Sequence, residues 1–283
     1  GAAKIVDHTA IGCWANQRVA CVDFRVIKLH PAFAGFSPDD KAWAWYGIPY
    51  AKPPIGDLRW KPPVKPDSWD GVREATAWAD QCAQPSYLEA YGKGSMSEDC
   101  LYLNVVAPKG YEGEALPVML WLHGGGYAIL TSNSTTYNHT ALPSQGVIVV
   151  TVNHRLGALG YMAHPELTRE SPQHSSGNYS QLDQIAALEW VRDNIGEFGG
   201  DPNNVTIFGQ SGGGLKAISL LNSRTRVCRI GICGFCGVNA RNCTSCVFVA
   251  IISSCNFEII CSWTVACCSG STTPKVVSRD GRK

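Results

Sequence analysis

The chain has 283 residues, of which 45% are hydrophobic and 17% are charged. This length and composition are typical of a globular protein with a sizeable core, and they exclude a collagenous or intrinsically disordered chain. The formal net charge of +1 gives no electrostatic reason to expect nucleic acid or an anionic membrane as a partner.

Charge and cysteine content both change abruptly near residue 221. Residues 1–221 hold 16 Lys/Arg and 21 Asp/Glu, whereas residues 222–283 hold 8 Lys/Arg and 2 Asp/Glu. Nine of the 13 cysteines lie in this second part. We therefore expect three segments: a weakly patterned segment over 1–40, a folded unit over 41–221, and a cysteine-rich tail over 222–283.

The first strong patterns along the chain predict strands. The segment that begins at Trp43, WAWYGIPYAKPPIGDLRWKPP, alternates apolar and polar residues and then turns at several prolines, which predicts a short strand and a surface loop. LYLNVVAP (101–108) is predicted to be a strand. VMLWLHGGG (118–126) and VIVVTVNHR (147–155) are predicted to be buried strands, because their apolar runs are rich in β-branched or large residues.

Helical patterns follow these strands. Residues 177–200 carry one apolar stripe with a period of 3.6 and end in glycines, which predicts a helix. VTIF (205–208) is a predicted strand, and GLKAISLLN (214–222) begins another helix. Strands that alternate with helices predict an α/β fold, with a mostly parallel central sheet flanked by helices.

A glycine-flanked serine separates this last strand from its helix. Gly209-Gln210-Ser211-Gly212-Gly213 fits the G-x-S-x-G nucleophile elbow, in which a catalytic serine occupies a strained turn that bulky neighbours would obstruct. The alternative is a flexible glycine turn, or a loop that binds phosphate. A P-loop is poorly supported because no Gly-x4-Gly-Lys run is present.

A second glycine run follows the strand VMLWL. An acyl-transfer enzyme must stabilise an oxyanion, and backbone N–H groups do so best where no side chain blocks the approach. The run HGGG (123–126) is a known way to build half of such a hole. A plain glycine turn is the alternative, although two such elements in one α/β chain are less expected by chance than one.

Between residues 43 and 221 the chain resembles the type-B carboxylesterases, a family that includes cholinesterases and para-nitrobenzyl esterases. The resemblance is carried by YGIPYAKPPIGDLRW, WDGVREAT, SEDCLYLNV, LPVMLWLHGGGY, VNHRLGALGY and GNYSQLDQIAALEWVRDNIGEFGGDPNNVTIFGQSGGG. It implies an α/β-hydrolase fold and the hydrolysis of small-molecule carboxylic esters without a cofactor.

The resemblance also implies roles for single residues. Ser211 matches the nucleophile, and Gly125, Gly126 and Gly212 match the oxyanion-hole donors. Position 212 is alanine in many relatives, and the backbone N–H is kept in either case.

Five further positions match structural features of the family. Cys82 and Cys100 match its first disulfide loop, and such a bridge would suit a secreted protein or another oxidising compartment. Two buried free thiols are the alternative. Glu98 and Arg155 match a buried structural ion pair, and Asp183 matches a structural acid.

The chain departs from the family after the serine. The family triad runs from Ser to an acid and then to His, but all seven histidines precede Ser211. They are His8, His30, His123, His139, His154, His164 and His174. We therefore expect a truncation after the elbow, which would leave an open sheet edge and exposed core surface.

The tail after about Leu221 resembles nothing in the family. The favoured interpretation is an out-of-frame or intronic translation that is poorly ordered. A small zinc module on Cys233, Cys236, Cys243 and Cys246 is a second interpretation, although the gap between the two pairs is short. A membrane segment over 247–268 is a third, and polar residues interrupt it.

The sequence thus predicts an ester hydrolase that acts through an acyl-enzyme on Ser211, with weak or absent turnover because a triad acid and histidine are not identifiable. The alternatives are a non-catalytic cholinesterase-like adhesion protein and the zinc-binding tail. No metal, cofactor or nucleic acid is expected at the serine site.

Overall fold

The computed structural model describes residues 5–6, 27–28, 32–85, 95–111, 113–134, 140–221, 230–232 and 247–253. Within them the strands are β1 (Ile5–Val6), β2 (Ile27–Lys28), β3 (Phe33–Ala34), β4 (Phe36–Asp39), β5 (Ala42–Pro49), β6 (Arg73–Glu74), β7 (Gln81–Cys82), β8 (Met96–Ser97), β9 (Tyr102–Pro108), β10 (Leu116–Leu122), β11 (Ile148–Val152), β12 (Gly200–Gln210), β13 (Ile230–Ile232) and β14 (Val247–Ser253). The α-helices are α1 (Gly157–Tyr161), α2 (Pro165–Glu170), α3 (Tyr179–Asn194) and α4 (Gly212–Leu221), and the 3-10 helices are η1 (Gly56–Leu58), η3 (Pro143–Gln145) and η4 (Ile195–Phe198).

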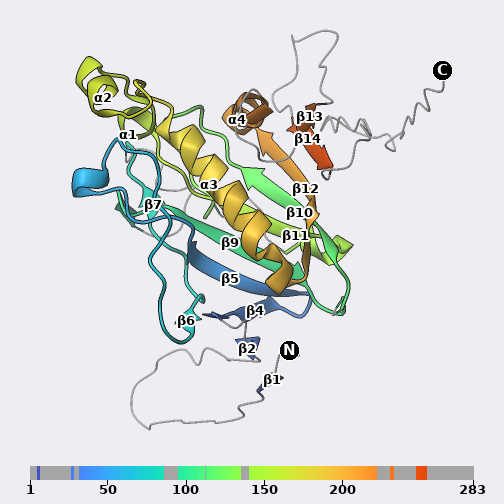
Figure 1. Ribbon diagram of the computed structural model, residues 1–283. Coiled ribbons are helices and arrows are strands. Elements are labelled where there is room, and N and C mark those ends of the chain that lie inside the picture. Colours follow the sequence, from blue (N-terminus) through green and yellow to red (C-terminus); the bar gives the residue numbers. More distant parts are fainter. Residues whose placement is uncertain are drawn as a thin grey trace, which may run out of the picture.

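A twisted eight-stranded sheet forms the centre of the molecule, in the order β13-β14-β12-β10-β11-β9-β5-β4 (Figure 1). The three strands β11, β10 and β12 are parallel to one another. All five residues of β11 are buried, as expected for a strand that is covered on both faces. In β10 only alternate residues are fully buried. The predicted α/β fold is confirmed.

The outer strands run antiparallel to this centre. β9 pairs antiparallel with β11 and β5, and β4 pairs antiparallel with β5. β14 pairs antiparallel with β12 on the other side. The sheet is therefore mixed, and the expectation of a mostly parallel sheet holds only for its central strands.

The expected open edge at β12 is not what the structure shows. Residues 247–253 form β14. The whole of β14 pairs with the segment of β12 from Asn204 to Gln210. The segment VFVAIIS suits this position because β-branched and aromatic residues favour extended backbone. Part of the proposed membrane segment over 247–268 is therefore a strand, and the rest lies outside the described residues, as do the four tail cysteines of the zinc hypothesis.

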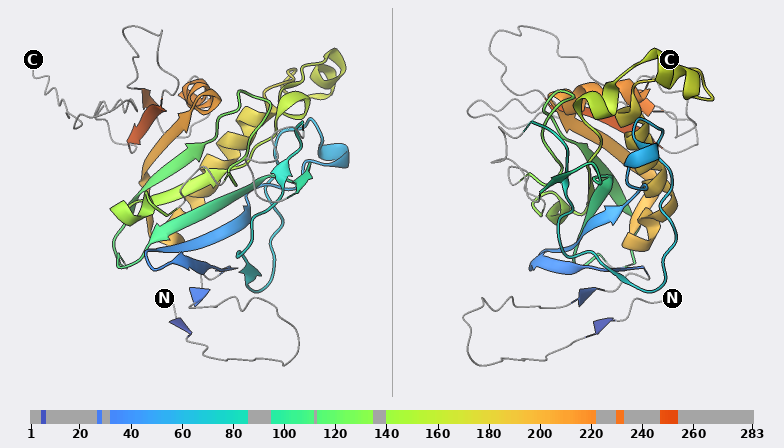
Figure 2. Two further views of the ribbon diagram at one scale, coloured as in Figure 1. Left: turned by 180° about the vertical axis from the view of Figure 1, so that it is seen from behind. Right: turned by 90° about the vertical axis from the view of Figure 1, so that its left-hand side faces the viewer.

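The helix predicted over 177–200 is confirmed as α3, which lies across one face of the sheet (Figures 1 and 2). Its residues Ile185, Leu188 and Val191 recur at helical spacing and are buried in the core with the sheet. η4 continues the chain, and Gly199 ends it with a φ of 87°, a backbone conformation that glycine adopts at little cost.

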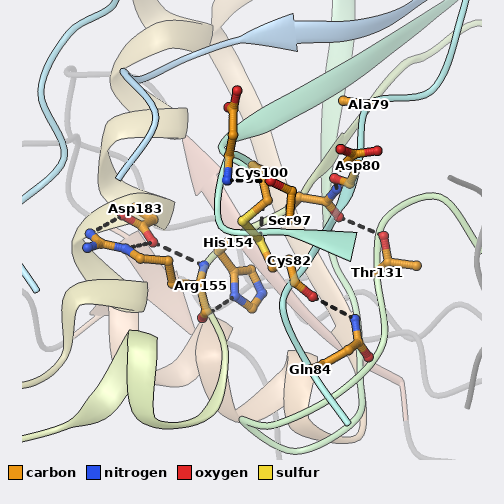
Figure 3. Close-up of a disulfide and its surroundings, with 12 residues drawn as sticks. Ala79, Asp80, Cys82, Gln84, Ser97, Cys100, Thr131, His154, Arg155 and Asp183 are labelled. Carbon is orange, nitrogen blue, oxygen red and sulfur yellow. Dashed lines mark hydrogen bonds and ion pairs between the residues drawn. A yellow bond between two sulfur atoms is a disulfide. The ribbon is translucent and has the colours of Figure 1, made fainter. Parts of the chain in front are cut away.

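A buried disulfide joins Cys82 of β7 to Cys100, which directly precedes β9 (Figure 3). The Cα atoms are 4.9 Å apart, and both residues are at most 3% exposed. The predicted bridge is confirmed. It fixes the start of β9 to the short strand β7.

The predicted ion pair between Glu98 and Arg155 is wrong. Arg155 instead binds Asp183 of α3, with its Nε 2.9 Å from Oδ2 and its Nη2 2.7 Å from Oδ1 (Figure 3). Glu98 forms an equivalent two-point contact with Arg59, at 2.6 and 2.7 Å. Each carboxylate is therefore saturated by a different guanidinium, and only a cavity of about 10 Å³ lies among Glu98, Arg59 and Arg155.

The pair of Arg155 and Asp183 is almost completely buried, with side chains 4% and 0% exposed. We expect Asp183→Asn to lower the free energy of unfolding by about 3–5 kcal/mol, because it leaves a buried guanidinium without its counter-charge. Urea unfolding followed by circular dichroism measures this change. Glu166→Gln is the matched control, because Glu166 pairs with Arg169 on the surface and such pairs contribute little. Equal losses in both variants would contradict this account.

Candidate active site

Ser211 occupies a sharp turn between β12 and α4. Its φ is +56°, in the left-handed region that a non-glycine residue enters only at some cost in energy. The residue is exposed. The strained strand-to-helix turn predicted for the sequence GQSGG is therefore confirmed, while the role of Ser211 as a nucleophile stays a prediction.

The glycines around Ser211 are required because backbone atoms occupy the space of a side chain. A Cβ on Gly209 would lie 2.6 Å from the carbonyl carbon of Gly213 and 2.7 Å from the carbonyl oxygen of Leu122. A Cβ on Gly213 would lie 2.0 Å from the same Leu122 oxygen. Real Cβ atoms do not make such contacts, so the end of β10 and the start of α4 meet only where glycine is present.

The glycine run 123–126 lies directly beside this turn. β10 and β12 are parallel neighbours, with Leu122 opposite Gly209, so the carboxyl ends of the two strands lie side by side. A Cβ on Gly124 would lie 3.5 Å from Cβ of Ser211, and a Cβ on Gly212 would lie 2.4 Å from the carbonyl oxygen of Gly126. An alanine at position 212 would thus require the glycine run to move.

The three glycines predicted to be oxyanion donors keep their N–H groups free. Within the part of the chain that the structure describes, no hydrogen bond is donated by the backbone N–H of Gly125, Gly126 or Gly212. Gly212 begins α4, where the first N–H groups have no partner inside the helix. Gly125 and Gly126 have φ values of 81° and 62°, which expose their backbone on a turn without side chains. The arrangement can accept an anion.

Two buried histidines, His123 of this run and His154, pack against each other. The rings of His123 and His154 are stacked, with centroids 4.5 Å apart and planes within 3°. They are 1% and 0% exposed. Burial lowers the pKa of both well below the ordinary value, and the charge of Lys216 lowers it further. Both rings are therefore neutral at pH 7.

These histidines are held by other partners. Nδ1 of His154 lies 2.9 Å from Oγ of Ser180, and Nδ1 of His123 lies 3.0 Å from the carbonyl oxygen of Gly124. Among the described residues no hydrogen bond joins Ser211 to a histidine. The structure thus brings together the serine and the glycine run, and it assigns His123 and His154 to the supporting core.

Sequence analysis did not single out Lys216, although it lies next to the site. Lys216 belongs to α4 and is only 1% exposed. Its Nζ donates to the carbonyl oxygens of His123 at 3.0 Å and Gly124 at 3.4 Å. Burial lowers its pKa to about 7. The only available sequence signal was a single charged residue within the apolar stretch GLKAISLL.

An open pocket of about 280 Å³ adjoins Lys216 on the side of α3 and α4. Tyr127, Tyr161 and Gln184 contribute to its walls.

The described residues hold no group of three or more His, Cys, Asp or Glu side chains that could bind a metal ion. Nor does any helix in them have the length and apolar character needed to cross a membrane.

A model of the carboxylesterase family matches residues 34–227. The chain belongs to this family. It is 49% identical to a fumonisin B1 esterase of Sphingopyxis macrogoltabida over 176 residues, which are 62% of this chain and 32% of that protein. It is 48% identical to the para-nitrobenzyl esterase of Bacillus subtilis (strain 168) over 181 residues, which are 62% of this chain and 36% of that protein.

Solved structures give the same result for the fold. A thermophilic para-nitrobenzyl (PNB) esterase matches this carboxylesterase-family chain with a TM-score of 0.61 and 44% sequence identity, over 67% of this chain and 39% of that one. The predicted α/β-hydrolase fold is confirmed. The chain spans about a third of the length of the curated relatives it matches.

We expect Gly213→Ala to destabilise the protein by several kcal/mol, because the new methyl group would overlap the backbone of Leu122. Gly196→Ala is the matched control, since nothing lies within 4 Å of a Cβ at that position. Thermal unfolding of the two variants measures the difference. An unchanged melting temperature for Gly213→Ala would show that the elbow and β10 do not meet as described.

The buried histidines predict a loss of stability in acid. Because their folded pKa values lie below the unfolded value of about 6.5, the unfolded chain binds more protons below that pH. The loss of stability caused by these two histidines is therefore absent above pH 6.5 and grows as the pH drops, by about 1.4 kcal/mol per pH unit for each histidine.

We expect the free energy of unfolding to fall less steeply with decreasing pH in His154→Asn between pH 5.0 and 6.5, because unfolding takes up one proton fewer. His174→Asn is the control, because it makes the same substitution at an exposed histidine. Urea unfolding at several pH values gives the slopes. A slope in His154→Asn as steep as that of the unmodified protein would contradict the burial of a neutral imidazole.

Proposed function

We propose that this chain carries the nucleophile and the oxyanion hole of a serine carboxylesterase that acts on small-molecule carboxylic esters without a cofactor. The observation that carries the proposal is the exposed Ser211 at a φ of +56°, with the free N–H groups of the glycine run beside it. Family membership supports it. The relatives named above, an esterase of fumonisin B1 and a para-nitrobenzyl esterase, support the ester class and leave the acyl and alcohol groups open.

The chemistry follows from these groups. Oγ of Ser211 attacks the ester carbonyl carbon, and the carbonyl oxygen becomes an oxyanion that accepts hydrogen bonds from the N–H groups of Gly125, Gly126 and Gly212. Collapse of this tetrahedral species expels the alcohol and leaves an acyl group on Ser211. Water then attacks the acyl carbon to form a second tetrahedral species, whose collapse breaks the bond to Oγ of Ser211 and releases the carboxylic acid.

Both steps require a general base for the serine and for the water. Neither His123 nor His154 can take this role, because each ring is buried and held by another group. We therefore propose that turnover by the 283-residue chain is weak or absent. We also propose an oxidising compartment for the protein, because the buried bridge of Cys82 and Cys100 would persist there.

The test is labelling by a fluorophosphonate probe together with turnover of p-nitrophenyl acetate. We expect slow labelling that is lost in Ser211→Ala and kept in Ser219→Ala, which removes another hydroxyl of the same helix region. Turnover should be about 10³- to 10⁶-fold below that of the para-nitrobenzyl esterase of Bacillus subtilis measured in parallel, because loss of a triad base costs this much.

Two results would contradict the proposal. Labelling that persists in Ser211→Ala would show that another group is the nucleophile. Turnover close to that of the para-nitrobenzyl esterase would show that a base reaches Ser211 after all.

A further inference from the structure

Lys216 is a buried lysine that contacts the backbone of the glycine run. Lys216 is 1% exposed, and it forms no salt bridge among the residues that the structure describes. Its two hydrogen bonds go to the carbonyl oxygens of His123 and Gly124. Burying a lysine is costly in free energy, so an unbranched apolar side chain such as methionine would serve better if the position required only packing.

Peptide geometry links these carbonyls to the predicted oxyanion donors. The carbonyl of Gly124 and the N–H of Gly125 belong to one planar trans peptide unit, in which the two groups point in opposite directions. When Lys216 holds the oxygen of Gly124 on the inner side, the N–H of Gly125 must point outward. The contact with the oxygen of His123 fixes the preceding peptide unit in the same way.

An anchor matters for the glycine run because its backbone can adopt several conformations. Three consecutive glycines have wide conformational freedom, and both Gly125 and Gly126 lie in the left-handed region. Lys216 comes five positions after Ser211 on the helix that begins at the elbow. Lys216 therefore links the orientation of the proposed oxyanion hole to α4, the helix that directly follows Ser211.

We infer that Lys216 is a positioning residue of the proposed oxyanion hole, which acts by holding the carbonyl oxygens of His123 and Gly124 so that the N–H of Gly125 faces the oxyanion. When Lys216 is protonated, its charge also polarises these peptide units, which strengthens the N–H groups as donors. The inference rests on the proposed function for its effect on reaction rate, but not for its effect on the geometry of the loop.

The experiment compares three variants of the full chain. Lys216→Met keeps an unbranched side chain that is one heavy atom shorter and removes the donors. Lys216→Arg restores donors and charge, and the adjoining 280 Å³ pocket gives room for the longer side chain. Lys109→Met is the matched control. Lys109 directly follows β9 and also donates to a carbonyl oxygen, that of Asp39 on β4 at 3.3 Å, on the other side of the sheet from β12. Circular dichroism confirms that each variant is folded.

Two readouts are measured on each protein: the rate at which the fluorophosphonate labels Ser211, and the ¹H–¹⁵N signal of the Gly125 amide. We expect Lys216→Met to slow labelling at least 10-fold and to shift the Gly125 signal, Lys216→Arg to recover most of both, and Lys109→Met to change neither. A folded Lys216→Met with the normal labelling rate, or a Lys216→Arg no faster than Lys216→Met, would overturn the inference and leave the proposed function intact.

If the unmodified chain is not labelled, the proposed function fails and the amide signal alone decides. A Gly125 signal that shifts in Lys216→Met and returns in Lys216→Arg would then support the positioning role. A Gly125 signal that is the same in all variants would overturn it.

Discussion

The parallel pairing of β10 with β12 is the constraint on which the rest of the site depends. It sets Leu122 opposite Gly209, so the glycine run and the serine turn leave neighbouring strands at the same edge of the sheet. The backbones then approach so closely that Gly209, Gly212 and Gly213 have no room for a side chain. Sheet register, rather than any side-chain contact of Ser211, therefore brings the predicted nucleophile and the predicted donors together.

Beneath this junction the protein buries an unusual number of polar groups. His123, His154 and Lys216 are all at most 1% exposed, and none of them has a carboxylate partner among the described residues. Burial keeps the two imidazoles neutral and lowers the pKa of the lysine to about 7. Such a cluster costs stability, which natural proteins accept mostly at functional sites.

A second set of contacts fixes the surroundings of the site. Arg155 follows β11 and binds Asp183 of α3, so the loop after the central strand is tied to the helix that covers the sheet. The disulfide of Cys82 and Cys100 and the contact between Arg59 and Glu98 tie down the neighbouring loop. These links leave the edge of the sheet rigid where the serine and the glycine run emerge.

The amino-acid sequence by itself determined the features that depend on neighbouring residues. Apolar runs specify β10 and β11, a period of 3.6 specifies α3, and glycines mark both the serine turn and the run 123–126, because backbone conformation and amphipathic spacing are local properties. The resemblance to a family added the disulfide. Only the tertiary structure decided the partner of Glu98, the strand β14 beside β12 and the burial of Lys216. Each of these depends on contacts between distant segments, such as the 92 positions that separate Lys216 from Gly124, and no local pattern encodes which of several chemically equivalent groups will meet.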